Sequence, residues 1–303
     1  MSSEVAIRAP RPDEAEAAAV FLNEHSRRLH GTDAQSPAEL RNYWELPDVD
    51  PERDVFLAEG PDGELNGYAD VGSFGGATWL DVRGFEPTVL RPLLEAAEAR
   101  AREKRPGVPI RGSVSEQDRV LRDLFESAGY RVVRHSFRMV IDLDGELPAP
   151  RWPDGFSVRT FEEGEERRVY EAQMDSFADT WSFARDPFED WAQWFLGHPS
   201  FDPELWFLAE AEQGDLAGIA LTRPLETETG VGWVDILGVR PAFRRRGLAI
   251  ALLEHVFQEY ARRGFERVGL GVDAENPTGA VRLYERAGMR VDRRGLQYES
   301  VQG

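Results

Sequence analysis

The sequence predicts an α/β fold, an α+β mixed sheet, present as two homologous domains in tandem. Its 303 residues suffice for two domains of about 150 residues each. Residues 56–69 align without a gap with residues 207–220, 151 positions later, and 8 of the 14 positions are identical. A second pair of segments, 124–132 and 283–291, aligns at an offset of 159. The chain therefore repeats one domain.

Both halves show the same order of elements. A short strand and one or two helices precede a hairpin, predicted by two apolar runs around an acidic turn with glycine. In the second half, apolar periodicity then predicts a strand over 231–239, a helix over 248–262, a strand over 268–272 and a helix over 277–287, closed by Gly288. This order favours a mixed sheet with crossover helices.

Residues 145–155 contain three prolines, which interrupt helices and strands. We predict a linker there. The N-terminal domain is expected at 1–144 and the C-terminal domain at 156–303.

Composition narrows the possible partners. The 55 acidic residues outnumber the 36 lysines and arginines, for a net charge of -19, which disfavours nucleic acid as a partner. No cysteine is present, which excludes disulfides, thiolate metal ligands and thiol nucleophiles. The five histidines show no metal-ligand spacing, so no metal is expected. No membrane span or signal peptide is recognised, and we expect a cytoplasmic protein without a membrane partner.

The loop that follows the strand 231–239 favours an anionic ligand. It opens directly into a helix, where backbone N–H groups and the helix dipole attract negative charge. Gly247 and Ala249 are small where an anion would approach the backbone. Residues 236–253 hold four arginines and no acid. A solvated basic turn is the alternative interpretation.

These residues carry a resemblance to a known family. Arg244-x-x-Gly247-x-Ala249 resembles the Arg/Gln-x-x-Gly-x-Gly/Ala signature of the GNAT superfamily of acyl-CoA N-acyltransferases. Residues 276–289 are similar to that family's Asn-x-x-Ala-x-x-x-Tyr-x-x-x-Gly-Phe segment, with Met289 in place of the phenylalanine. The resemblance implies two tandem GNAT folds and an N-acetyltransferase with acetyl-CoA as acyl donor.

The resemblance also implies roles for individual residues. The pyrophosphate of acetyl-CoA would lie on the loop residues Arg244, Arg245, Arg246, Gly247, Leu248 and Ala249. The pantetheine arm would pair with the strand at Leu237, Gly238 and Val239, and the Leu237 N–H would stabilise the oxyanion. Asn276 and Ala280 would also contact the cofactor.

Proton transfers are assigned to two side chains. Tyr284 would protonate the departing thiolate, although a core aromatic on an amphipathic helix is the other interpretation. Asp235 is the candidate base or water-orienting residue, with Glu226 and Glu228 as competitors and a structural ion pair as the alternative. Strand alternation places Asp235 on one face with Trp233, Leu237 and Val239. Family members often carry an acid on this strand, at the position of Asp235 or two residues earlier, where Trp233 stands here.

The first half lacks these features. Residues 79–82 match 233–236 at an offset of 154, and Leu93 and Leu94 match Leu252 and Leu253 at 159, so five residues are missing where the phosphate loop would be. Phe125 stands in the position of Tyr284. We expect this half to have lost acetyl-CoA binding and catalysis.

The acceptor is predicted to be a small-molecule amine or a peptide N-terminus, attacking the thioester directly in a ternary complex. Residues 177–195 mix aromatic and acidic side chains, which suits a cationic amine but equally suits helix packing. Some tandem members of the family acetylate a cysteinyl amine, and a non-catalytic acyl-CoA-binding regulator is a further alternative. The sequence does not fix the oligomeric state.

Overall fold

The computed structural model describes residues 5–60 and 63–301, which form two compact units. The first unit comprises Met1–His135, Gln193–Pro199 and Arg294–Gly303, and the second Ser136–Ala192 and Ser200–Arg293. Residues 61 and 62, in the turn of the first predicted hairpin, lie outside the described residues. No helix in the described ranges is long and apolar enough to cross a membrane.

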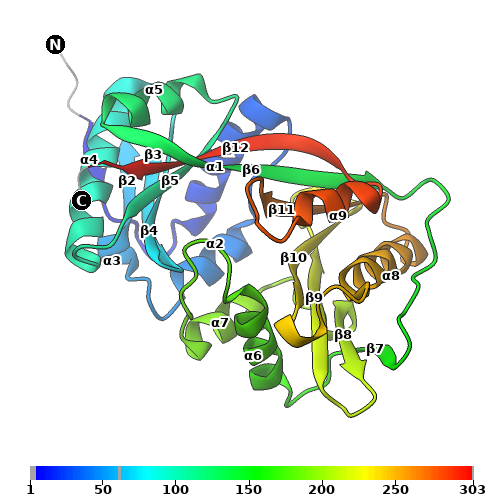
Figure 1. Ribbon diagram of the computed structural model, residues 1–303. Coiled ribbons are helices and arrows are strands. Elements are labelled where there is room, and N and C mark those ends of the chain that lie inside the picture. Colours follow the sequence, from blue (N-terminus) through cyan, green and yellow to red (C-terminus); the bar gives the residue numbers. More distant parts are fainter. Residues whose placement is uncertain (1–4, 61–62, 302–303) are drawn as a thin grey trace. The chain divides into compact units, whose positions relative to one another are not determined.

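The first unit is a mixed sheet with helices (Figure 1). Its strands pair in the order β1 (Ala6–Arg8), β2 (Val55–Glu59), β3 (Leu65–Phe74), β4 (Ala77–Gly84), β5 (Ile110–Ser115) and β12 (Arg290–Ser300). β4 and β5 are parallel, and the other described pairs are antiparallel. The helices are α1 (Ala15–His30), α2 (Pro37–Trp44), α3 (Pro51–Asp54), α4 (Pro87–Lys104) and α5 (Arg119–Ser127).

The second unit has the same topology. Its strands pair in the order β7 (Phe156–Thr160), β8 (Trp206–Ala211), β9 (Leu216–Pro224), β10 (Val231–Val239), β11 (Arg267–Asp273) and β6 (Tyr130–Asp142), and β10 and β11 are parallel. The helices are α6 (Glu166–Phe177), α7 (Phe188–Phe195), α8 (Leu248–Arg262) and α9 (Ala280–Arg286), with the 3-10 turns η1 (Pro203–Leu205) and η2 (Pro241–Phe243).

The two halves of the chain exchange their last strands. β6 follows α5 in sequence, yet its residues Ser136–Asp142 pair with β11 of the second unit. β12 follows α9, and its residues Gly295–Glu299 pair with β5 of the first unit. Each compact unit is therefore discontinuous in sequence. The boundaries 1–144, 145–155 and 156–303 describe the sequence repeat and stay a prediction for the folding domains.

The predicted elements of the second half are largely confirmed. β10 and α8 have the predicted bounds, and β11 is one residue longer at each end. α9 begins at Ala280 instead of 277, because Gly279 adopts a left-handed φ of 78° at its N-cap. Residues 145–155 contain neither helix nor strand, as the prolines predict.

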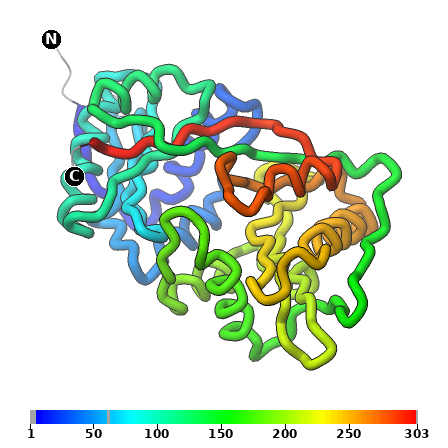
Figure 2. Tube along the Cα trace, viewed as in Figure 1, coloured from blue at the N-terminus to red at the C-terminus, as the bar shows by residue number. Residues whose placement is uncertain are grey.

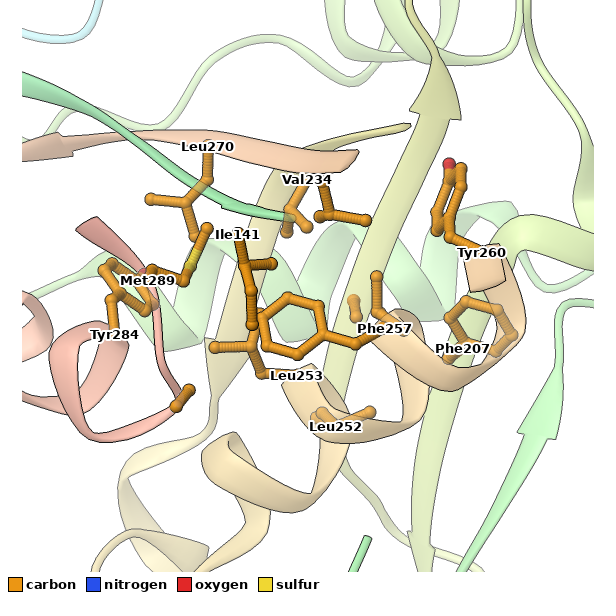
Figure 3. Close-up of a cluster of buried hydrophobic side chains, with 14 of the residues drawn as sticks. Ile141, Phe207, Val234, Leu252, Leu253, Phe257, Tyr260, Leu270, Tyr284 and Met289 are labelled. Carbon is orange, nitrogen blue, oxygen red and sulfur yellow. The ribbon is translucent and has the colours of Figure 1, made fainter. Parts of the chain in front are cut away.

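The core of the second unit lies between the sheet and α8. Val234 and Leu270 of the sheet pack with Leu252, Leu253 and Phe257 of α8 (Figure 3). The amphipathic period of residues 248–262 accounts for this, because one face of α8 is apolar and buried. This packing fixes α8 on the sheet, and with it the helix N-terminus that follows β10 in sequence.

Candidate active site

β10 and β11 pair only along their first halves. Val231–Val234 pair with Arg267–Leu270, and no pairing of β10 with β11 beyond Val234 occurs among the described residues. β11 instead continues to Asp273 along β6. The edge of β10 from Asp235 to Val239 therefore presents backbone groups that an extended ligand can pair with as an added strand.

A β-bulge at Asp235 accompanies this separation. β9 pairs Thr222 with Val234 and Leu221 with Ile236, so no residue lies opposite Asp235. Leu237 and Val239 pack against the same core as Val234. The prediction that they share a face with Trp233 is wrong, because the extra residue at the bulge reverses the alternation after Asp235.

The opposite face of β10 meets α6. A Cβ on Gly238 would lie 2.9 Å from Cβ of Ser176, so only glycine allows α6 to approach this closely. Gly238 is buried. In this structure it is thus a packing residue, while its neighbours Leu237 and Val239 lie on the α8 side.

The loop after β10 leads through η2 into α8 (Figure 2). Arg245 and Gly247 both adopt left-handed φ angles, 63° and 91°, a geometry that turns successive N–H groups toward one side and favours anion binding. Gly247 is the N-cap of α8, without a side-chain cap and without an acid in the first turn. The N–H groups at Leu248 and Ala249 therefore belong to an uncapped helix start, which attracts negative charge.

Two arginines anchor this loop to α6. Arg240 pairs with Asp175 at 2.8 Å. Arg244 pairs with Asp179 at 2.5 Å and also donates to the carbonyl oxygens of Val239 and Ser176, at 3.1 and 3.0 Å. Hydrogen bonds from Arg244 lower the pKa of Asp179. The side chain of Arg244 therefore fixes the loop against α6 and the end of β10.

Tyr284 lies beside Met289 at the edge of the core (Figure 3). Burial raises the pKa of the Tyr284 phenol to about 12, so it keeps its proton at neutral pH. Its hydroxyl has no hydrogen-bond partner among the described residues. The ring is a core residue, and the hydroxyl remains a protonated group.

Asn276 shapes the turn that precedes α9. Its Oδ1 accepts hydrogen bonds from the N–H and hydroxyl of Thr278, at 2.9 and 2.5 Å, as short polar side chains do in turns. Ala280 is the first residue of α9 and is half-buried. Contacts of either residue with a cofactor stay predictions.

The three candidate carboxylates lie in different surroundings. Asp235 is half-buried and pairs with Arg223 of β9, Nε to Oδ2, at 3.2 Å. Glu228 forms two hydrogen bonds with Arg138, at 2.7 and 2.8 Å. Glu226 accepts from the Ser200 hydroxyl at 2.8 Å. Of the three, Asp235 is the residue placed at the β10 bulge.

Trp233, two residues before Asp235 in β10, packs against β11 and Arg138. A Cβ on Gly269 would lie 2.8 Å from the Trp233 ring, so the ring rests on β11. The Arg138 guanidinium lies 5.3 Å from the ring centroid. One of the two positions where the family often has an acid thus carries an aromatic ring within cation–π distance of Arg138.

Several aromatic residues of the predicted acceptor segment pack within the protein. Trp191 is buried, stacks on Phe188 and donates to Gln173 at 2.8 Å. Phe177 lies 3.4 Å from where a Cβ on Gly238 would be. Trp194 is 42% exposed and belongs to the first unit, where it contacts Tyr43 edge-on. Helix packing therefore explains Trp191 and Phe188.

The sequence did not reveal Arg223, Asp175 and Asp179 as ion-pair partners. Arg223 comes from β9, Asp175 from α6 and Asp179 from the turn after α6, and no motif in the sequence joins them to Asp235, Arg240 or Arg244. The one usable signal for Arg223 was its place in the strand before β10. In the part of the chain that the structure describes, no group of His, Asp and Glu side chains could hold a metal ion.

Comparisons with known proteins identify relatives of the chain. Residues 167–289 match the model of the Acetyltransferase (GNAT) family. A mycothiol acetyltransferase of Salinispora arenicola is 30% identical over 272 residues, 87% of each chain. One of Streptomyces coelicolor is 34% identical over 175 residues, 56% of this chain and 54% of that protein. The chain thus spans about half the length of several curated relatives that it matches.

Solved structures extend the likeness to the whole chain. A GCN5-related N-acetyltransferase from Sphaerobacter thermophilus has a TM-score of 0.78 and 34% identity, covering 98% of this chain and 95% of that one. A tandem GNAT protein from the clavulanic acid biosynthesis pathway has a TM-score of 0.74 at 14% identity, which speaks for the fold. The predicted mixed α/β tandem fold is confirmed, and the chain belongs to the GNAT family of acetyltransferases.

Proposed function

We propose that this chain is an N-acetyltransferase that transfers an acetyl group from acetyl-CoA to a primary amine in its second unit. The observation that carries the proposal is the separation of β10 from β11 beside the N-terminus of α8. An extended thioester arm fits along the β10 edge, and an anion fits at the helix start. Few other ligands combine these two parts.

The charges around the loop fit the donor. Arg245 and Arg246 stand at a helix start with no acid in its first turn, within a chain of net charge -19. Backbone N–H groups from Gly247 to Ala249 would bind the pyrophosphate. Leu237 and Val239 would pair with the pantetheine arm, and Asn276 and Ala280 would border it. Acetyl-CoA would supply the activated acyl group.

The residues of the site divide the chemical work. The Leu237 N–H would stabilise negative charge on the carbonyl oxygen during attack. Tyr284 would donate its proton to the departing thiolate, which needs little assistance at a thiol pKa of about 8.5. Asp235, which pairs with Arg223, would orient the amine or the water that removes its proton.

The first unit differs at each of these points. β4 pairs with β3 in unbroken register from Gly67 to Phe74, without the bulge found in β10. Phe85, which follows β4, packs against His25 of α1, and His25 lies 3.3 Å from Asp118. Phe125 is buried between Tyr130 and Tyr298. We therefore assign catalysis to the second unit.

The acceptor class has one specific candidate. Relatives named mycothiol acetyltransferase match up to 87% of this chain, which favours a cysteinyl amine of the mycothiol synthase type. A small-molecule amine or a peptide N-terminus are the other acceptors to test. The family's acid on this strand stands at the position of Asp235 or two residues earlier, and this chain has Trp233 at the earlier one, where the mycothiol synthase type has an acid.

A release assay tests the proposal. Acetyl-CoA is incubated with a panel of cysteinyl amines, aminosugars, polyamines and peptides, and the free thiol is measured. Turnover with at least one amine is expected, and Tyr284→Phe should lower it. Acetyl-CoA binding without turnover on any amine would favour the regulatory alternative.

A further inference from the structure

The four arginines of the loop fall into two pairs. Arg240 is neutralised by Asp175 of α6, and Arg244 by Asp179, which lies in the turn after α6. Their positive charge is therefore largely used within the protein. This leaves two arginines, adjacent in sequence and directly before the N-cap of α8.

Arg245 and Arg246 have no carboxylate within ion-pair distance among the described residues, and both are exposed. Arg245 adopts a φ of 63°, unusual for a residue with a side chain. This conformation is maintained although it costs about 1 kcal/mol or more. Two uncompensated cations in an acid-rich chain favour an anionic ligand.

An aromatic platform supports Arg246. Its guanidinium lies 5.8 Å from the ring centroids of both Phe156 and Phe243. The two rings contact each other edge-on at 6.0 Å, and both pack partly against the core of the second unit. Cation–π contacts restrict the arginine and so reduce the entropy lost when it binds a ligand.

The platform comes from η2 in the loop itself and from the start of β7. Phe243 belongs to η2 and Phe156 begins β7, while Pro153 lies 3.9 Å from where a Cβ on Gly247 would be. A donor with its thioester arm along β10 and its pyrophosphate at Gly247 must place its nucleotide beyond the loop. Since Arg240 and Arg244 are paired with acids, Arg245 and Arg246 are the two arginines of the loop that can bind the nucleotide end of the donor.

We propose that Arg245 and Arg246, supported by Phe156 and Phe243, bind the 3′-phosphate of the donor's adenosine, so that the protein selects 3′-phosphorylated acyl-CoA over its 3′-dephospho form. This inference rests on the proposed function. A phosphate monoester carries close to two negative charges and accepts paired hydrogen bonds from guanidinium groups. Both arginines are exposed, so the selectivity decreases as salt rises.

Calorimetric titration with acetyl-CoA and 3′-dephospho-acetyl-CoA tests the inference. The wild type is expected to bind acetyl-CoA about tenfold more tightly, given charge-assisted hydrogen bonds. In the double variant Arg245→Gln/Arg246→Gln the two ligands should bind about equally, through weaker binding of acetyl-CoA alone. Arg286→Gln, an exposed arginine at the end of α9, is the matched control and should keep the wild-type ratio.

The possible results separate the two proposals. Equal affinity of the wild type for both ligands would overturn the 3′-phosphate assignment while leaving acetyl-CoA as donor. Equal weakening of both ligands in the double variant would also overturn it, because the arginines would then act on the pyrophosphate. Failure of the wild type to bind either ligand would overturn the proposed function and this inference together.

Discussion

Arg8 and Arg159 stand 151 positions apart, and each forms ion pairs with two glutamates at equivalent positions of its own unit. Arg8 pairs with Glu14 and Glu59, at 2.6 and 2.5 Å. Arg159 pairs with Glu165 and Glu210, at 2.5 and 2.8 Å. Both triads tie the first strand of a unit to the start of its first helix and to its second strand. The duplication seen in the sequence thus extends to single ion pairs.

Replacement of Glu14 or Glu165 by glutamine should destabilise the protein in a pH-dependent way. Hydrogen bonds from Arg8 and Arg159 lower the pKa of Glu14 and Glu165 from 4.5 to about 2. This stabilisation is present above the unfolded pKa and is lost as pH falls from about 4.5 to 2. Each variant should lose about 1–2 kcal/mol in urea unfolding at pH 7.

The exposed Glu16→Gln serves as the matched control and should unfold like the wild type. A loss of the same size at pH 7 and pH 2 would show that charge pairing is not its cause.

Asp70 should make the first unit less stable as pH rises. Burial and the charge of Asp81 raise the pKa of Asp70 to about 7, although it accepts hydrogen bonds from Tyr43 and Tyr68. A raised pKa favours folding while the group is protonated, so stability falls from about pH 4 to pH 7. Asp70→Asn should remove this decline and gain about 1–3 kcal/mol at pH 8 relative to the wild type.

Urea unfolding curves of both proteins from pH 4 to pH 8 measure the effect. Parallel stability profiles for the wild type and Asp70→Asn would refute it.

Tyr284→Phe should lower kcat by about 10- to 100-fold and leave acetyl-CoA affinity unchanged, because it removes only a proton donor. The ring stays in the core, and the hydroxyl has no partner among the described residues, so Tm should change little. With the Tyr284 pKa at about 12, turnover should show no decline from this residue below pH 10. Stopped assays measure kcat, and calorimetry measures the affinity for acetyl-CoA. An unchanged kcat would show that Tyr284 is not the proton donor.

Asp235→Asn and Glu228→Gln should behave differently. Asp235 lies at the bulge beside Arg223, so its variant should lose turnover by about 10-fold or more while remaining folded. Glu228 is paired with Arg138 in a mostly buried site, so its variant should lose about 3 kcal/mol of stability. Thermal unfolding and kcat are measured for each. The reverse outcome would make Glu228 the better candidate base.

Local patterns predicted the elements of the fold well. The bounds of β10 and α8 followed from apolar periodicity. The start of α8 could be predicted because Gly247, a local signal in the sequence, directly precedes the helix. The face of Leu237 was predicted wrongly, because a single bulge residue, Asp235, reverses every later position of the strand. Alternation within β10 alone does not reveal that extra residue.

Long-range partners could not be predicted. The side chain of Arg244 pairs with Asp179, 65 positions earlier, and no local pattern indicates this contact. The exchange of β6 and β12 between the units likewise depends on pairing between distant segments. Sequence patterns specify local backbone conformation, whereas these contacts depend on tertiary packing.

The central claim is that the second unit alone holds acetyl-CoA. Isothermal titration of the full chain should show one binding site, abolished by Gly247→Glu, which adds a negative charge and a side chain at a φ of 91°. Thr88→Glu places the same charge at the exposed start of α4 in the first unit and should leave binding intact. No binding by the wild type, binding that survives Gly247→Glu, or a second site lost in Thr88→Glu would contradict the account.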